Sequence, residues 1–372
     1  MQPGLDRPGQ RPRVLMVGPS LQQRGGVASV LRTWRDQGFF DRLQVHYVAT
    51  NGPTGRWKKA LTALGAWWRC ARRIVGRRCD LIHVHTSSYA SFWRKSPVFA
   101  MALACRVPLV VSLHGGAFRE FHGTGGRLRR AWIAHVMRRA ACFVVLTEGW
   151  ARWAREVAPQ ADVQVVPNVT AIPAAPDARR TEPDLLLYLG RIEGDKGIHV
   201  LIEALSLANR RGAGWRLACG GEGDVGAARA FAAQCRVEEG ALAFLGWLDD
   251  AAKADWLARC ALLVLPSFVE NMPVVVIEAF AHGRPVLATH VGGLPDMVTP
   301  GVDGWLVDAG DAGGLAQALL TAAAGRGTLE AMGRAGRAKA IEHYAPERVA
   351  LRLEKLYAAC VVQGDRPDVR SS

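Results

Sequence analysis

Two carboxylates, Glu270 and Glu278, lie with seven residues between them in the run PSFVENMPVVVIEAFAHGRPVLA at positions 266–288. Apolar residues before Pro266 predict a buried strand, and a helix is expected to begin near Pro273, because proline suits the first turn. Glu270 then belongs to the loop after the strand, and Glu278 to the helix. Ionised carboxylates accept hydrogen bonds from neighbouring hydroxyl groups, so the pair suits a hydroxyl-rich ligand. The alternative is that the pair is structural, with one Glu capping the helix and the other buried against a partner in the core, because that arrangement would show the same spacing.

The same loop also offers backbone donors. The N-terminus of a helix carries partial positive charge and unsatisfied N–H groups, which attract anions. We therefore expect the N–H groups around Asn271, Met272 and Val274 to face anionic atoms of the ligand, and we assign this loop, Pro273 included, to the donor-binding set.

Two cations follow another predicted strand, in YLGRIEGDKGIHVLIEAL at 188–205. The strand ends at Leu189, and Arg191 and Lys196 come before a helix that begins near Gly197. Cations beside a helix N-terminus suit a diphosphate, and they would stabilise the charge that builds on a departing nucleoside diphosphate. A solvated basic loop is the alternative.

The elements that position these residues alternate between strands and helices, which predicts α/β domains with parallel sheets. Apolar runs typical of strands occupy 14–17, 45–49, 81–85, 109–113, 143–146 and 163–166, and then 185–189, 217–219, 243–245, 262–265, 285–288 and 305–307. A Pro- and Ala-rich linker at 167–183 separates the two halves. We predict a first domain at 1–172, a second domain at 173–345, and a C-terminal segment at 346–372 whose helix crosses back to the first domain.

Taken together and in order, these motifs resemble family 4 of the retaining glycosyltransferases. The likeness rests on Gly190-Arg191, Lys196-Gly197, CGGEG at 219–223, Pro266-Ser267, and the Glu270 and Glu278 pair, and it extends from Arg13 to about Tyr357. It implies the GT-B fold, in which two Rossmann-like doubly wound domains face a central cleft. In that fold the N-terminal domain at 1–172 binds the acceptor and the domain at 173–345 binds the nucleotide-sugar donor. It also implies that Arg191 and Lys196 hold the donor diphosphate, that Glu278 binds the nucleotide ribose, and that Glu270 touches the transferred sugar. Asn271 departs from the family, where Gly or Pro is more usual.

The first half contributes further candidates. Gly25 and Gly26 follow the first strand and open a helix, and glycine lets backbone N–H groups approach a ligand closely, so we assign both to the donor-binding set. They do not form G-x-G-x-x-G, so no dinucleotide fingerprint is supported. His114 ends a strand and resembles the family's active-site histidine beside the donor sugar. We assign catalytic roles to His114, Glu270, Arg191 and Lys196.

Residues 80–96, DLIHVHTSSYASFWRKS, resemble bacterial glycosyltransferases of exopolysaccharide and lipopolysaccharide assembly. The likeness indicates that polar side chains here meet an acceptor sugar or its lipid pyrophosphate. The acceptor-side candidates are His85, Ser87, Arg94 and Lys95, together with Glu120.

Charge is unevenly distributed along the chain. Residues 1–180 carry 28 Lys and Arg against 9 Asp and Glu, a net charge of +19, whereas residues 181–372 carry 19 against 24, a net charge of −5. The first half therefore favours an anionic partner. Nucleic acid is not expected, because the basic residues lie on separate helices and no recognition motif is present.

One basic amphipathic helix is predicted at Trp57–Arg78. Helical spacing places Trp57, Leu61, Leu64, Trp68, Ala71 and Val75 on one face, widened by Trp67 and Ile74, and Lys58, Lys59, Arg69, Arg72 and Arg73 on another. Such a helix suits an anionic membrane surface, but a stripe that packs on the sheet is the alternative. With no long apolar run and no signal-like start, we expect a cytoplasmic protein, peripheral at the inner face of the membrane.

The combined reading is a retaining, metal-independent transferase that moves a sugar from a nucleotide-sugar to a glycan or lipid-pyrophosphate-linked acceptor. The nucleotide-sugar is a substrate, and no cofactor is expected. No D-x-D triplet offers ligands to a divalent metal. The alternatives are a sugar-nucleotide epimerase of the same fold and, with less support, a basic nucleic-acid-binding protein.

Overall fold

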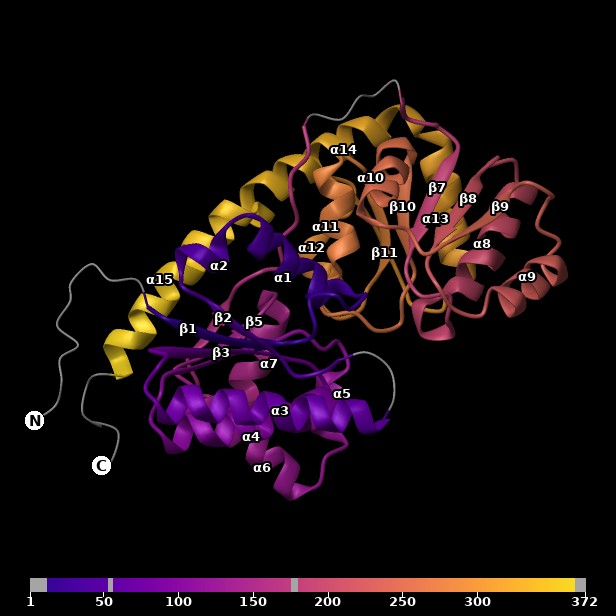
Figure 1. Ribbon diagram of the computed structural model, residues 1–372. Helices are drawn as coiled ribbons and strands as arrows, with labels where there is room; N and C mark the ends of the chain where they lie inside the picture. Colours follow the sequence, from indigo (N-terminus) through magenta and orange to yellow (C-terminus); the bar gives the residue numbers. More distant parts are fainter. Residues whose placement is uncertain (1–11, 53–55, 175–179, 365–372) are drawn as a thin grey trace, which may run out of the picture. The chain divides into compact units, whose positions relative to one another are not determined.

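The structure, a computed structural model, describes residues 12–52, 56–174 and 180–364, with the side chains of 56–60, 363 and 364 left out (Figure 1). It divides into two compact units. Unit 1 comprises Met1–Pro167 and Pro346–Ser372, and unit 2 comprises Asn168–Ala345. The division after Pro167 lies a few residues before the predicted boundary at 172, and the C-terminal helix belongs to unit 1.

Unit 1 is built on a six-stranded parallel sheet of order β2-β1-β3-β4-β5-β6. Its strands are β1 (Val14–Gly18), β2 (His46–Ala49), β3 (Leu81–Thr86), β4 (Leu109–Leu113), β5 (Cys142–Val145) and β6 (Val163–Val165). Its helices are α1 (Gly26–Asp36), α2 (Phe39–Arg42), α3 (Arg56–Val75), α4 (Ala90–Ala104), α5 (Phe118–Gly123), α6 (Arg127–Arg139), α7 (Glu148–Val157) and α15 (Pro346–Gly364).

Unit 2 repeats this plan with the order β12-β11-β10-β7-β8-β9, again parallel. Its strands are β7 (Leu185–Leu189), β8 (Arg216–Gly220), β9 (Leu242–Gly246), β10 (Leu262–Leu265), β11 (Val286–Thr289) and β12 (Gly304–Val307). The helices are α8 (Ile198–Arg210), α9 (Val225–Gln234), α10 (Asp250–Arg259), α11 (Val274–Ala281), α12 (Leu294–Met297), α13 (Ala312–Ala324) and α14 (Arg326–Lys339), with a 3₁₀ turn at Gly194–Lys196 and a π-helical turn at Ala340–Tyr344. The predicted fold of two doubly wound parallel sheets is confirmed.

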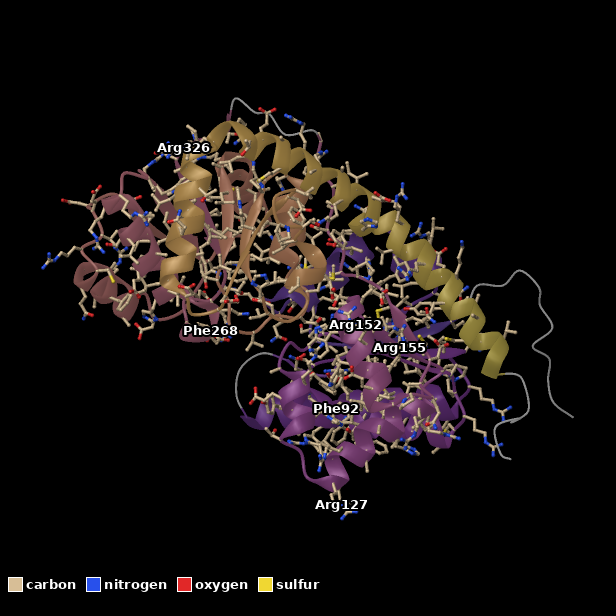
Figure 2. The ribbon with its side chains drawn as sticks, turned by 180° about the vertical axis from the view of Figure 1, so that it is seen from behind. Phe92, Arg127, Arg152, Arg155, Phe268 and Arg326 are labelled. Atoms are coloured by element: carbon tan, nitrogen blue, oxygen red, sulfur yellow. The ribbon has the colours of Figure 1, made fainter. Side chains whose placement is uncertain are left out.

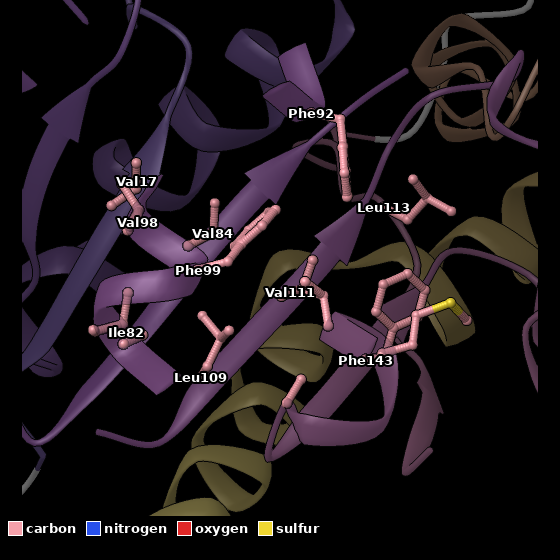
Figure 3. Packing of buried hydrophobic residues seen from close by; sticks show 14 of the residues in the cluster. Val17, Ile82, Val84, Phe92, Val98, Phe99, Leu109, Val111, Leu113 and Phe143 are labelled. Carbon is pink, nitrogen blue, oxygen red and sulfur yellow. The ribbon is translucent and has the colours of Figure 1, made fainter. Parts of the chain in front are cut away.

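The central strands are apolar along their whole length because helices cover both faces of a parallel sheet. In unit 1, Ile82 and Val84 of β3 and Leu109 and Val111 of β4 pack with Phe99 of α4 in the buried core (Figure 3). Polar side chains appear where these strands end. That arrangement directs the chemistry of each unit to the carboxyl edge of its sheet.

Helix α3 corrects one prediction. The face of α3 that is buried against the unit 1 core consists of Ala63, Ala66, Cys70 and Ile74, and Trp67 packs against it. Trp67 and Ile74 therefore do not widen the predicted apolar stripe. Leu61, Leu64, Trp68 and Val75 are instead 54–74% exposed. The stripe therefore does not pack on the sheet. The side chains of Trp57, Lys58 and Lys59 lie outside the described residues. Among the helices described, none is long and apolar enough to cross a membrane.

Candidate functional site

Glu270 and Lys196 meet at the carboxyl edge of the unit 2 sheet. Glu270 lies in the loop between β10 and α11, a loop marked in Figure 2 by Phe268. Lys196 Nζ lies 2.6 Å from Glu270 Oε1 and donates to the carbonyl of Val269 over 3.3 Å. Both side chains are largely buried, at 19% and 12% exposed. Two residues more than seventy positions apart in the chain are thus brought together, with opposite charges in contact.

Two glycines make this close approach sterically feasible. Gly197, with φ of +72°, lies so close to the next loop that an added Cβ would sit 1.9 Å from the carbonyl oxygen of Pro266. Gly292, with φ of +57°, lies against Glu270, where a Cβ would sit 1.7 Å from the carbonyl oxygen. Any larger residue would have to displace the backbone that carries the carboxylate, and both backbone conformations favour glycine.

Glu278 lies on α11 and is 8% exposed. Its Oε1 accepts a hydrogen bond of 2.5 Å from Nζ of Lys253 on α10, which also lies 3.3 Å from Asp250. Burial by itself would lower the pKa of Lys253, but the charges of Glu278 and Asp250 outweigh it and raise the pKa. Lys253 therefore stays charged and fixes Glu278. The sequence analysis missed Lys253. Its position one helical turn before Leu257, which is buried, could have indicated that its side chain lies on the inner face of α10.

Arg191 follows β7 on the exposed side of the same edge, with 55% of its side chain accessible. It pairs with Glu193 and, over 2.7 Å, with Asp195. Exposed ion pairs stabilise a fold by only about 0–1 kcal/mol, so these contacts hold the Arg191 side chain weakly.

The loop between β10 and α11 is held by its backbone. The carbonyl of Asn271 accepts from the N–H of Gly293 over 2.9 Å, and that of Met272 accepts from Asn168 Nδ2 over 2.8 Å. Helix α11 begins at Val274 directly after Pro273, and among the described residues no side chain caps its N-terminus. The predicted donors therefore lie in one rigid loop beside Glu270.

In unit 1, a pocket of about 280 Å³ lies between the loop after β1 and the end of β3. Six predicted residues line it, namely Gly25, Gly26, His85, Ser87, Arg94 and Lys95. Glu120, the fifth acceptor-side candidate, does not line this pocket. It lies on the short helix α5, and its carboxylate interacts with the hydroxyl of Tyr89.

Three buried histidines lie close together, His83 and His85 on β3 and His114 directly after β4, and the rings of His83 and His85 are 4.1 Å apart. His85 Nδ1 lies 2.9 Å from Nε2 of His114, and His83 bonds to Ser112 Oγ over 2.6 Å and to the hydroxyl of Tyr357 over 2.5 Å. Burial holds the pKa of His83 and of His114 to about 3, with the charge of Lys95 also lowering that of His114. These imidazoles are therefore neutral near pH 7. Sequence analysis missed His83 and Tyr357, because their partners lie far apart in the chain.

Comparison with known families decides the identity. Residues 4–169 match the model described as Glycosyl transferase 4-like domain, and residues 183–324 match Glycosyl transferases group 1. The chain belongs to the family 4 type of glycosyltransferases. The two matches follow one another and together cover most of this glycosyltransferase, including every motif of the unit 2 site.

Curated relatives carry related names. A glycogen synthase of Mycobacterium tuberculosis is 28% identical over 76% of this glycosyltransferase and 69% of its own length. The amylovoran biosynthesis glycosyltransferase AmsK of Erwinia amylovora is 29% identical over 47% of this chain and 46% of its own. The lipopolysaccharide core biosynthesis glycosyltransferase LpsE of Rhizobium meliloti is 29% identical over 61% and 65%.

Solved structures confirm that the fold is of the GT-B type. Sucrose-phosphate synthase from Thermosynechococcus elongatus superposes with a TM-score of 0.78 at 19% identity, over 95% of this chain and all of its own. HepE of Anabaena, in complex with UDP, has a TM-score of 0.74 at 16% identity, over 93% of this chain and all of its own.

Proposed function

We propose that this glycosyltransferase moves a sugar from a nucleoside diphosphate sugar to a lipid-linked glycan acceptor, with retention of the anomeric configuration and without a metal ion. The observation that carries the proposal is the pairing of Lys196 with Glu270 and of Lys253 with Glu278 within unit 2. Each carboxylate keeps acceptor sites for hydroxyl groups, and the cation beside Glu270 suits a phosphate.

The proposed chemistry is electrostatic. The bond between the anomeric carbon and the diphosphate breaks, and an acceptor hydroxyl oxygen forms the new bond to that carbon while its proton passes to the leaving phosphate. Lys196 and Arg191 stabilise the negative charge on the departing nucleoside diphosphate. Glu278, held by Lys253, accepts hydrogen bonds from the ribose, and Glu270 accepts them from the transferred sugar. His114, neutral at the end of β4, contacts that sugar as a hydrogen-bonding group and not as a charge.

Metal independence rests on the sequence, which contains no D-x-D triplet. Lys196 and Arg191 supply the positive charge that a divalent ion would otherwise provide at the departing diphosphate. We expect the transfer rate to be unchanged after extensive dialysis against EDTA. A rate that falls and recovers on addition of Mg²⁺ or Mn²⁺ would overturn this part of the proposal.

The pathway is inferred from relatives. AmsK and LpsE are named for amylovoran and for lipopolysaccharide core biosynthesis, and HepE was solved with UDP and with UDP-glucose. They support a nucleotide-sugar donor and a bacterial exopolysaccharide or lipopolysaccharide acceptor. The acceptor's lipid carrier would place the enzyme at the inner face of the cytoplasmic membrane.

The exposed stripe of α3 supports that location. Leu61, Leu64, Trp68 and Val75 project apolar surface from a helix that also exposes Arg69 and Arg72. Arg127, at the start of α6 in the same unit, also points away from the fold (Figure 2). Apolar residues interleaved with arginines bind anionic lipid surfaces, because both burial and charge then favour association.

The test of the function uses Glu278→Gln and Lys196→Ala. Both variants are expected to melt cooperatively and to lose transfer to a bacterial lipid-linked glycan extract, measured as nucleoside diphosphate released. Proton NMR of the product should show the anomeric configuration of the donor. Full transfer by either folded variant would refute the assignment, and a change in the donor alone, without acceptor, would favour an epimerase.

A further inference from the structure

His85 and His114 each keep one open ring nitrogen. The two rings share a single hydrogen bond, in which His85 Nδ1 lies 2.9 Å from His114 Nε2. The other two nitrogens, His85 Nε2 and His114 Nδ1, are covered and have no hydrogen-bond partner among the described residues. Buried polar atoms are normally paired, so two open nitrogens on one hydrogen-bonded pair indicate that the pair serves more than the packing of the fold.

Both rings are neutral, and this restricts where their protons lie. Burial, with the charges of neighbouring groups, lowers the pKa of His85 far below its usual range and that of His114 to about 3. A neutral imidazole has one donor and one acceptor nitrogen. If His85 donates the shared hydrogen bond, His114 must carry its own proton on Nδ1. If His114 donates it, His85 must carry its proton on Nε2. The two rings therefore always have the same tautomer, and the two open nitrogens always have opposite roles.

The ring of His85 is held firmly by its neighbours. The ring of His83, two residues earlier on β3, lies 4.1 Å away, and both nitrogens of His83 are bonded, Nδ1 to the hydroxyl of Tyr357 and Nε2 to Ser112 Oγ. Trp34 of α1, which is buried, lies 5.8 Å from the ring of His85. The last torsion of a histidine is otherwise soft, so this packing is what prevents the ring from turning. His85 is therefore the rigid member of the pair.

His114 depends on this partner. Its backbone N–H donates to the carbonyl of Thr86 over 2.8 Å, which places its Cα directly after β4. Within the part of the chain that the structure describes, its ring has no hydrogen bond other than the one to His85. Without that bond the ring could turn about its last torsion and carry its proton on either nitrogen. Either change would alter the group that Nδ1 offers to a ligand, and a site group has to be held by its supporting residues to act precisely.

We propose that His85 is a positioning residue for His114, because its hydrogen bond fixes the His114 ring and ties the tautomer of that ring to its own. The inference rests on the proposed function, in which His114 contacts the transferred sugar. His85 then acts through His114 and not by the contact with the acceptor that the sequence indicates. His83 and Tyr357 support the same contact, because they hold the ring of His85 in place.

One consequence is that a ligand can select the tautomer of both rings. A sugar hydroxyl that accepts from His114 Nδ1 requires a proton on Nδ1 of each ring, and a hydroxyl that donates to His114 Nδ1 requires the proton on Nε2 of each. The change between these states removes a proton from one open nitrogen, moves the shared proton across the hydrogen bond and adds a proton to the other open nitrogen. The number of protons is unchanged, so the pair stays neutral.

The first measurement is nitrogen NMR of the full, ligand-free chain with ¹⁵N-labelled histidine, in which protonated and bare ring nitrogens have different shifts. The chain has ten histidines, so their signals can be assigned with single variants. In the wild type, His85 and His114 should show the same tautomer. His85→Leu should change the signals of His114, whereas His135→Leu, at an exposed position of α6, should not. Opposite tautomers in the wild type, or His114 signals that are the same in His85→Leu, would overturn the proposal.

The second measurement separates positioning from acceptor binding by the kinetics of transfer. In His85→Leu, kcat should fall at least about tenfold, because a misplacement of about 1 Å in an active site can cost about a hundredfold. The KM for the lipid-linked acceptor should stay at the wild-type value. His85→Asn should recover most of the loss, because its side-chain amide reaches the position of Nδ1, and His135→Leu should retain full activity.

Two checks make these results decisive. Cooperative melting shows that the His85 variants are folded, and the comparison of tautomers in the wild type needs no variant at all. An unchanged kcat in folded His85→Leu, or a raised KM for the acceptor with kcat retained, would overturn the proposal. Failure of the proposed function would look different, because the wild type would then transfer no sugar from any nucleotide-sugar while the two rings still shared one tautomer.

Discussion

The ion pair between Lys253 and Glu278 offers the sharpest test of how unit 2 is built. At 2.5 Å and an effective dielectric constant of about 20, the Coulomb attraction is roughly 7 kcal/mol before desolvation is subtracted. The side chains are only 22% and 10% exposed, so Lys253→Met would leave a carboxylate in a site with little water. Breaking a buried pair typically costs about 3–5 kcal/mol, and the remaining exposure reduces this to about 2 kcal/mol.

The assay is a double-mutant cycle. In a domain of this size, about 2 kcal/mol lowers the melting temperature by roughly 4–8 °C for Lys253→Met. Glu278→Gln should cost less, because Lys253 keeps its contact with Asp250, and the double variant should be more stable than Lys253→Met alone. Asp250→Asn, at an exposed position, is the control and should change stability little. Additive effects in the double variant, or a Lys253→Met protein as stable as the wild type, would refute the reasoning.

Three further perturbations follow from other contacts. Gly292→Ala should displace the loop of Glu270, because its Cβ would collide with the Glu270 carbonyl, and transfer should fall at least about tenfold at an unfolding cost of about 1–3 kcal/mol. Acidification should destabilise unit 1, because His83 takes up a proton near pH 6.5 in the unfolded chain but stays neutral to about pH 3 in the folded one. Between these two pH values His83 lowers the free energy of unfolding by about 1.4 kcal/mol per pH unit. The dependence of the unfolding free energy on pH should therefore be weaker in His83→Gln. Trp68→Ser should weaken sedimentation with phosphatidylglycerol vesicles by about tenfold, because it removes exposed apolar surface from α3.

Matched controls exist for two of these variants. Gly301→Ala also places a side chain at positive φ, but no atom lies within 4 Å of its Cβ, so transfer should be retained. Leu351→Ser removes an exposed apolar residue from α15 instead of α3 and should leave vesicle binding intact. Equal loss of transfer in Gly292→Ala and Gly301→Ala would contradict the role given to Gly292. Equal vesicle binding by Trp68→Ser and the wild type would contradict the role given to α3. The role of His83 would be contradicted if the stability of His83→Gln depended on pH as that of the wild type does.

The strands could be predicted from the sequence because a strand buried on both faces must be apolar throughout. The predicted runs at 109–113, 185–189 and 262–265 coincide with β4, β7 and β10. The loops after β7 and β10 could also be predicted, because a glycine or a proline ends each strand and charged residues follow it. Lys196 and Glu270 could therefore be placed at one sheet edge before any contact was known.

Other features depend on which side of a helix meets the sheet, and periodicity alone does not settle that. In α3 both sides carry apolar residues, and the smaller set of Ala63, Ala66 and Cys70 packs inward because it allows a close approach to the sheet. Lys253 and Tyr357 were missed for a related reason. Each owes its role to one partner on a distant element, and no local spacing encodes that partner.

In the proposed function, unit 2 binds a nucleotide-sugar through Glu278 and Lys196. The most direct measurement is the thermal shift of the purified chain with a panel of UDP-, GDP- and dTDP-sugars. A ligand at a hundredfold excess over its dissociation constant stabilises the native state by about 2.7 kcal/mol. At least one nucleotide-sugar should raise the melting temperature of the wild type, and Glu278→Gln and Lys196→Ala should abolish the rise. A panel without any shift, or a shift that both variants retain, would contradict it.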